Sequence, residues 1–270
     1  MPVPTTESPF DAYAPPRIAS MVEGAGVRKA GMDALPTITL GILAGAFIAL
    51  GAMYYTVVTT GSGFGFGPTR MLGGVAFSVG LILVVVGGAE LFTGNNLIVM
   101  AWISGHVTGP RLLRNWGLVY AANLVGALGL ALMGHWAGLQ GLAGGEVGGH
   151  AAAIARAKVN LGFWEAFWRG VLCNLLVCLA VWLSFAARTV AGKAVAVVFP
   201  VSAFVALGFE HSVANMYLIP AGMLAGDGGI ALGGMLKNLI PVTLGNVVGG
   251  GGLVALVYWA VYLRGADPGP

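Results

Sequence analysis

Long apolar runs with few charges are the feature that most constrains this chain. The run from Leu35 to Val58 is about 24 residues, which at 1.5 Å per residue can cross a hydrocarbon layer of about 30 Å. Only 9% of the 270 residues are charged, against about 25% in soluble domains, and the mean hydropathy is +0.87. The chain is therefore predicted to be an all-α integral membrane protein.

Five more apolar runs of spanning length come after the first, and two of them are interrupted by polar residues. Non-helical backbone at membrane depth is tolerated only where protein buries it or a cavity receives it, so the interruptions mark special sites. The predicted second to sixth spans, with their interruptions, are Met71–Ile103 broken at Glu90–Asn96, Trp116–Trp136, Phe163–Ala187, Ala194–Leu224 broken at Gly208–Met216, and Leu239–Val261. The two tryptophans of the third span are expected at the two membrane interfaces.

The ends of the chain are predicted to lie outside the membrane. Residues 1–34 are expected to form a cytoplasmic amphipathic arm on the membrane surface, residues 35–262 the six-span domain, and residues 263–270 a cytoplasmic tail. No cleavable signal is expected, because no apolar segment precedes Leu35.

The two halves of the sequence repeat. A shift of 120 or 123 residues superposes two sets of identical or similar residues. At 120 the pairs are Gly88 with Gly208, Glu90 with Glu210 and Asn95 with Asn215; at 123 they are Arg114 with Lys237, Asn115 with Asn238, Asn123 with Asn246 and Gly126 with Gly249. Because each half has three spans, an odd number, the halves must cross the membrane in opposite directions. The prediction is a three-plus-three inverted repeat with broken second and fifth helices.

The second interruption carries the most unusual chemistry. Glu210, His211, Ser212 and Asn215 lie in a stretch that is otherwise apolar. Burying such groups in hydrocarbon costs several kcal/mol unless they face a cavity or one another, so an ionisable cluster within the membrane predicts a functional site. A lone buried histidine can also be a structural donor satisfied by its neighbours, and this alternative stays open.

Loop cations predict the orientation. With both termini cytoplasmic, eight Lys and Arg residues lie inside and five outside, which agrees with the excess of cations expected on the cytoplasmic side. Lys158, in a glycine-rich loop before the fourth span, would then lie near the outer vestibule. It is interpreted either as a cation that attracts anions or as an ordinary exposed loop lysine.

Several other function classes are disfavoured. The cations are scattered between apolar runs without a basic stripe, which argues against nucleic acid. Cys173 and Cys178 are five residues apart on one predicted helix, a spacing that suits neither a disulfide nor a metal. The four histidines fall on different elements, so a haem or metal enzyme is not expected, and no cofactor is predicted.

Four motifs resemble the formate/nitrite transporter family. They are Glu90-Leu91-Phe92-Thr93, the stretch from Gly170 to Trp182, Gly208–Met216, and Asn238–Asn246. The resemblance covers nearly the whole chain. Ser8–Asp11 and Thr59–Gly63 look closest to the formate-channel branch, whereas Gly94-Asn95 is less typical of it and leaves nitrite or hydrosulfide open.

The resemblance implies an aquaporin-like protomer with its own pore, assembled as a homopentamer in the bacterial inner membrane. It also implies roles for particular residues. Apolar slits would be formed by Phe77, Leu81, Leu91 and Phe204; the polar network between them by Thr93, His211, Asn174, Glu210 and Asn215; and Lys158 would supply positive potential. For the slit residues, ordinary core packing is the competing interpretation.

A mechanism can be argued from physical chemistry. A small carboxylate crosses an apolar constriction cheaply only as the neutral acid, since desolvating the anion is prohibitive. Histidine has an unperturbed pKa of about 6.5 and can exchange a proton near neutral pH. His211 is therefore expected to protonate the anion transiently, with Glu210 and Thr93 fixing the ring's tautomer.

The predicted function is transport of formate, as a channel or coupled to protons. Inverted broken helices also serve channels for water and glycerol, so a neutral-solute channel is the alternative from another class. The buried Glu210 and His211 and the nearby Lys158 argue against that alternative.

Overall fold

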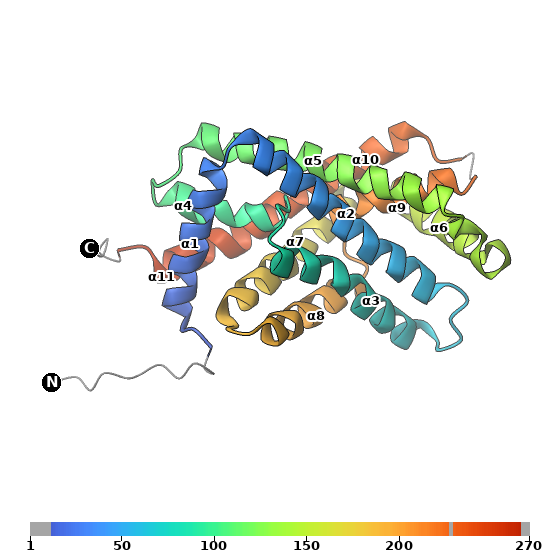
Figure 1. Ribbon diagram of the computed structural model, residues 1–270, viewed down its shortest axis with the longest axis horizontal. Helices are drawn as coiled ribbons and strands as arrows, with labels where there is room; N and C mark the ends of the chain where they lie inside the picture. The colour runs from blue at the N-terminus through green and yellow to red at the C-terminus, as the bar shows by residue number, and fades with distance from the viewer. Residues whose placement is uncertain (1–11, 227–228, 266–270) are drawn as a thin grey trace.

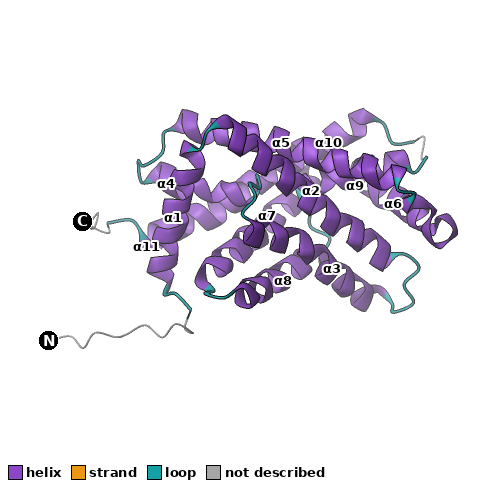
Figure 2. Cartoon of the chain, viewed as in Figure 1, coloured by secondary structure: helices purple, strands orange, loops and turns teal. Residues whose placement is uncertain are grey.

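The computed structural model describes residues 12–226 and 229–265, and in these ranges the chain forms only helices and loops (Figures 1 and 2). Five helical stretches in the described chain are long and apolar enough to cross a membrane. They are α2 (Ala34–Thr59), α3 (Phe66–Gly87), α5 (Gly109–Trp136), α7 (Phe163–Ala186) and the continuous run of α10 (Leu232–Val247), the π-helix η3 (Val248–Leu256) and α11 (Val257–Tyr262). The prediction of an all-helical membrane protein is confirmed.

Two apolar runs are each interrupted by a non-helical segment. After α3 the chain is non-helical over residues 88–93 and continues as the 3₁₀-helix η1 (Gly94–Ile98) and α4 (Val99–Ile103). After α8 (Val190–Ala206) it is non-helical over residues 207–211 and continues as α9 (Ser212–Leu224). Gly88 and Gly208 have φ values of 77° and 74°, a left-handed conformation that glycine adopts without steric cost. These glycines let each helix end abruptly.

Helix α1 (Pro15–Gly31) packs against η1 and α4 at the end of the molecule where α11 also lies (Figure 1). Ile18 and Val22 are buried in one apolar cluster with Leu97 and Ile98. The close contact has a local cause, because a Cβ atom on Gly26 would lie 3.3 Å from the Ala101 side chain. The helix therefore has a protein-facing side as well as an outer one.

Helix α6 (Glu146–Val159) corrects the prediction of a glycine-rich loop before the fourth span. It comes after the 3₁₀-helix η2 (Leu139–Gly145) and packs against α9. Glu146 lies in its first turn and Arg156 and Lys158 in its last, which matches the helix dipole. Gly148 and Gly149 weaken intrinsic helix propensity, so the composition hid a helix that tertiary packing stabilises.

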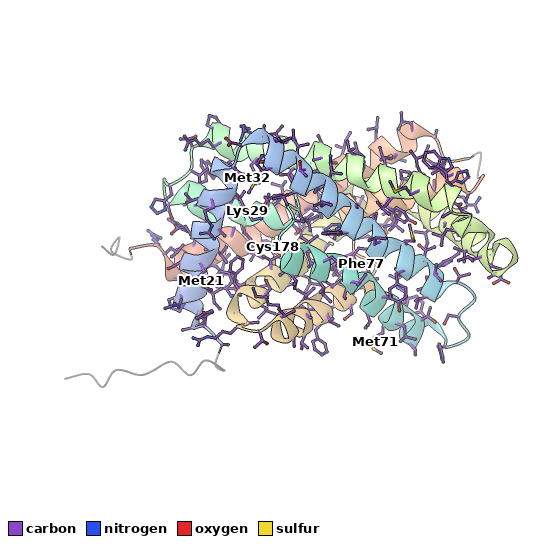
Figure 3. All side chains as sticks on the ribbon, viewed as in Figure 1. Met21, Lys29, Met32, Met71, Phe77 and Cys178 are labelled. Carbon is purple, nitrogen blue, oxygen red and sulfur yellow. The ribbon has the colours of Figure 1, made fainter. Side chains whose placement is uncertain are left out.

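Small residues bring the long helices close together. A Cβ atom on Gly126 of α5 would meet the carbonyl oxygen of Ile42 in α2, and one on Gly249 would meet that of Val171 in α7. Such contacts are typical of helices packed within membranes. Phe77 and Cys178 lie among the packed helices, whereas Met71 lies near the start of α3 on the outside (Figure 3).

Trp116 does not mark a helix end, so the predicted start of the third span at Trp116 is wrong. Helix α5 begins at Gly109, and the Trp116 ring packs edge-on against Phe92 with centroids 6.1 Å apart. Its indole N–H donates to the carbonyl of Asn95 at 3.0 Å. This tryptophan therefore supports the interrupted segment after α3.

Candidate functional site

Glu210 is a buried carboxylate in the break between α8 and α9. Its Oε1 atom accepts a hydrogen bond from Lys158 Nζ at 2.9 Å. Its Oε2 atom accepts from Asn215 Nδ2 at 2.6 Å and from Asn238 Nδ2 at 3.4 Å. Asn238 also donates to the backbone carbonyl of Lys158 at 2.9 Å. A buried charge is tolerated when it is paired and hydrogen-bonded in this way.

Lys158 is not an exposed loop lysine. It lies in the last turn of α6, its side chain is only 14% exposed, and its ammonium group pairs with Glu210. The ion pair brings α6 to the interrupted segment, although 52 residues separate the two side chains in the sequence.

Asn246 of α10 holds the backbone of the same break. Its Oδ1 atom accepts from the Ser212 N–H at 2.9 Å, and its Nδ2 atom donates to the carbonyls of Glu210 at 3.0 Å and Gly170 at 2.8 Å. One buried amide thus supplies partners to backbone groups that the interrupted helix leaves unpaired.

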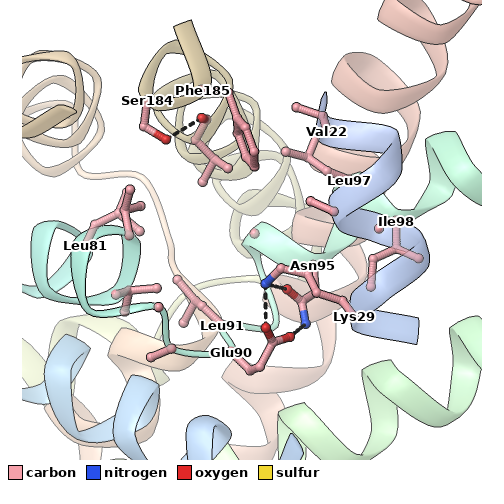
Figure 4. Close-up of a pocket in the computed structure, with 18 of the residues that line it drawn as sticks. Val22, Lys29, Leu81, Glu90, Leu91, Asn95, Leu97, Ile98, Ser184 and Phe185 are labelled. Atoms are coloured by element: carbon pink, nitrogen blue, oxygen red, sulfur yellow. Dashed lines mark hydrogen bonds and ion pairs between the residues drawn. The ribbon is translucent and has the colours of Figure 1, made fainter. Parts of the chain in front are cut away.

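The break after α3 has a matching network, and Figure 4 shows its Lys29, Glu90 and Asn95 members. Lys29 Nζ donates to Glu90 Oε1 at 2.7 Å and to Asn95 Oδ1 at 2.9 Å. Asn95 Nδ2 donates to Glu90 Oε2 at 2.7 Å and to Asn115 Oδ1 at 3.0 Å. Asn115 donates to the backbone carbonyl of Lys29 at 3.1 Å. The same residue types surround Glu210, but two of the described bonds differ: Asn215 Oδ1 has no described partner, and Asn238 donates to the acid itself.

Asn123 of α5 is the counterpart of Asn246. Its Oδ1 atom accepts from the Phe92 N–H at 2.9 Å, and its Nδ2 atom donates to the carbonyls of Glu90 at 2.9 Å and Gly41 at 2.7 Å. Both breaks are therefore stabilised by an acid, a lysine and three asparagines.

The sequence interpretation missed Lys29, which it placed in an arm apart from the channel. A usable signal existed. A shift of 129 residues superposes Lys29 on Lys158 and also Gly41 on Gly170, two glycines whose carbonyls accept from Asn123 and Asn246. The different shift, 129 rather than 120 or 123, kept the pair from being recognised.

His211 has both ring nitrogens in hydrogen bonds. Nδ1 accepts from the Ala214 N–H at 3.0 Å, so in the neutral ring the proton resides on Nε2. Nε2 lies 2.9 Å from the hydroxyl oxygen of Thr93. The Phe204 ring lies parallel to the imidazole, with an interplanar angle of 16° and a centroid distance of 6.0 Å. The tautomer and the ring orientation are therefore set by backbone, hydroxyl and aromatic contacts.

The expectation that Glu210 orients the His211 ring is wrong. In the described chain the carboxylate bonds to Lys158, Asn215 and Asn238, while the ring bonds to Ala214 and Thr93. The backbone at His211 is extended, with φ −108° and ψ 115°, and consecutive side chains of an extended segment point in opposite directions. The two side chains line the same cavity but bond to different partners, and Asn215 belongs with Glu210.

Asn174 connects the two halves behind Thr93. Its Nδ2 atom donates to the Thr93 carbonyl at 3.2 Å and to the Asn246 carbonyl at 2.7 Å. The Cys178 thiol also lies 3.4 Å from the Thr93 carbonyl oxygen. Asn174 therefore positions Thr93, whose hydroxyl is the hydrogen-bond partner of His211.

The predicted slit residues line two cavities. Leu81 and Leu91 line a cavity of about 220 Å³ beside Lys29 and Glu90 (Figure 4). Phe77, Phe204 and His211 line a second one of about 180 Å³. The Phe77 and Phe204 rings pack edge-on with centroids 5.7 Å apart. These four apolar side chains are buried, and each faces a cavity as well as the core.

Comparison with known proteins identifies relatives over the whole chain. A family model described as formate/nitrite transporter matches residues 16–260. The formate channel FocA of Escherichia coli K12 is 44% identical over 280 aligned positions, covering 97% of this chain and 98% of the relative. A probable formate transporter of Methanothermobacter thermautotrophicus is 42% identical, covering 96% and 98%.

Solved structures share the fold. A pentameric formate channel with formate bound is similar with a TM-score of 0.80 and 41% identity, covering 85% of this chain and 98% of that one. An ion channel of the same family is similar with a TM-score of 0.84 and 28% identity, covering 91% and 98%.

Proposed function

Because the chain belongs to the formate/nitrite transporter family, as its sequence motifs predicted, we propose that it transports formate across the membrane. The observation that carries this function is the full-length similarity to formate channels, one of them solved with formate bound. Formate is favoured over nitrite and hydrosulfide for the same reason. These relatives are channels or transporters, which agrees with a protein that is not an enzyme.

His211 is the group best suited to neutralise the anion. It is 2% exposed, it lines the same cavity as Phe77 and Phe204, and Thr93 holds its Nε2 atom. In its imidazolium form the ring gives one proton to the carboxylate that enters from the cavity beside Lys158, returns to the neutral imidazole, and lets formic acid pass the apolar constriction. The imidazole regains a proton from the aqueous side. This order avoids moving a bare anion through hydrocarbon.

The proposed assembly has six spans in a three-plus-three inverted repeat, with the second and fifth helices broken. Support comes from the matching hydrogen-bond networks around Glu90 and Glu210. As in the pentameric relative, five copies would assemble, each with its own pore. The protein would lie in the bacterial inner membrane with both termini cytoplasmic, residues 1–34 forming the inner arm, 35–262 the channel and 263–270 the tail.

Proteoliposomes containing a pH-sensitive dye test this function and the role of His211. An inward formate gradient should produce formate uptake and acidify the lumen in the parent protein faster than in protein-free liposomes. His211→Asn keeps polarity and approximate size but removes proton exchange, so acidification should fall at least tenfold. His135→Asn, the same change at an exposed position near the end of α5, is the matched control and should behave as the parent.

Two results would contradict the proposal. If the His211→Asn protein acidifies the lumen at the parent rate, the histidine is a structural donor only. If glycerol enters as fast as formate, the protein is a neutral-solute channel.

A further inference from the structure

The cavity beside His211 carries more positive charge than the ion pair of Lys158 and Glu210 explains. Arg70 and Arg169 also line it, so three cations face one carboxylate. Lys158 is already paired with Glu210 at 2.9 Å. The charge that this pair does not balance belongs to the two arginines.

Arg70 is fixed at the carboxyl end of α8. Its Nη2 atom donates to the Val205 carbonyl at 2.9 Å, and its Nε atom donates to the Ala206 carbonyl at 3.0 Å. The guanidinium also lies over the Phe66 ring, 5.7 Å from its centroid. These partners are neutral, so they orient the group without neutralising it.

Arg169 approaches the same point from α7. Its Nη1 atom donates to the Gly208 carbonyl at 3.3 Å, and its Nη2 atom donates to Glu165 at 2.6 Å. A Cβ atom on Gly208 would lie 2.9 Å from Arg70 Nη2 and 3.8 Å from Arg169 Nη1, so both guanidiniums gather at this glycine. The Glu165 side chain is 52% exposed, so water weakens its effect on Arg169 without removing it.

We propose that Arg70 and Arg169 form an anion-binding site at the mouth of this cavity, which holds a small monovalent carboxylate before it reaches Lys158 and His211. In each arginine the bonds described use two of the five N–H groups of the guanidinium. The other three N–H groups, which lie in the plane of the guanidinium, are left for a ligand. Guanidinium matches a carboxylate in two-point geometry, which makes formate the expected ligand. This inference rests on the proposed function.

The site predicts an effect on one face of the membrane only. In vesicles of defined orientation, Arg169→Gln and Arg70→Gln should each raise the half-saturating formate concentration about threefold for uptake from the Arg169 side, with the maximal rate retained. Uptake from the opposite side should not change its half-saturating concentration. Arg169→Lys keeps the charge and should recover most of the effect. Arg111→Gln is the matched control, because Arg111 is exposed and lines neither cavity.

A variant that is expected to lower the half-saturating concentration distinguishes an effect on the anion site from misfolding, because misfolding would not improve binding. Glu165→Gln removes a negative charge without touching the bond from Arg169 to Gly208, and it should lower the half-saturating concentration. Equal values in the parent, Arg169→Gln and Glu165→Gln proteins would overturn the anion site while leaving formate transport standing.

A binding measurement separates the two proposals. Sodium formate, compared with sodium gluconate at equal ionic strength, should raise the unfolding temperature of the detergent-solubilised parent and do so less for the Arg70→Gln/Arg169→Gln double variant. Stabilisation that depends on the arginines in a parent that moves no formate would support the site and reject the function. Equal stabilisation of both proteins would reject the site.

Discussion

The two interrupted segments share a clamp, which consists of an acid, a lysine and three asparagines, but they differ in the residue that follows the acid. Glu90 and Glu210 each bind a lysine and an asparagine, and Asn123 and Asn246 each hold three backbone groups. The next residue is Leu91 in the first segment and His211 in the second. The clamp is therefore structural and common to both, whereas the buried histidine occurs in one half only. Equivalent substitutions in the two halves separate these functions.

The two halves also differ in the residue that packs against the asparagine of the clamp: it is Gly45 of α2 in the first half and Asn174 of α7 in the second. Gly45 of α2 packs directly on the backbone of Asn123, so closely that a Cβ atom would meet its carbonyl oxygen. The 129-residue shift places Asn174 at the corresponding position of α7, where its amide donates to the Asn246 carbonyl. Asn174 lies against the π-helix η3, in which a Cβ atom on Gly250 would meet the Asn174 amide. Glycine in a π-helix thus leaves room for a side chain that the first half lacks.

The largest effect is expected from breaking the shared clamp. Asn246→Leu removes three hydrogen bonds from buried backbone groups, which at about 1 to 3 kcal/mol each predicts a loss of about 3 to 9 kcal/mol. Asn123→Leu should cost a similar amount, because it loses the matching three. Thermal unfolding in detergent measures both. A tolerated substitution in one half alone would show that the halves do not share the clamp.

The next effect should distinguish the two ion pairs. Glu210→Gln leaves Lys158, with a side chain only 14% exposed, without its counter-charge and should cost about 2 to 4 kcal/mol. Glu90→Gln should cost less, about 1 to 2 kcal/mol, because Lys29 is 30% exposed and water can replace the lost partner. The comparison is read from unfolding temperatures of the two glutamine variants. Equal losses would mean that exposure does not set the cost.

The membrane spans could be predicted because hydrocarbon thickness dictates the length of an apolar run. The breaks could be predicted because polar residues within such a run are costly unless protein or a cavity receives them. Less could be predicted where packing decides. Helix α6 has no apolar run from which it could be predicted. The role of Lys29 depends on the packing of α1 against the interrupted segment that contains Glu90. Adjacency in the sequence suggested that Glu210 orients the His211 ring, but the two side chains bond to different partners although they line the same cavity.

A smaller effect is expected from making the second half resemble the first at position 174. Asn174→Gly removes the bonds to the Thr93 and Asn246 carbonyls and should lower stability by about 2 kcal/mol. Formate flux should fall about three- to tenfold, because Thr93 is no longer held against His211. Asn174→Ala separates the lost amide from the added flexibility of glycine and should show the same loss of flux. Parent-level flux in both variants would remove Asn174 from the positioning of Thr93.

The smallest effect should come from Thr93→Val, which keeps the side-chain shape and removes only the hydroxyl at 2.9 Å from His211 Nε2. The expected loss of stability is about 0.5 to 1.5 kcal/mol, because the imidazole lines a cavity where water can replace the lost partner. Formate-dependent acidification should fall less than in His211→Asn, since the ring still has its Ala214 bond and can still exchange a proton. Thr93→Ser keeps the hydroxyl and is the matched control. If Thr93→Val abolished acidification as completely as His211→Asn, the hydroxyl itself would belong to the proton path, and the half that lacks the histidine would contribute directly to proton exchange.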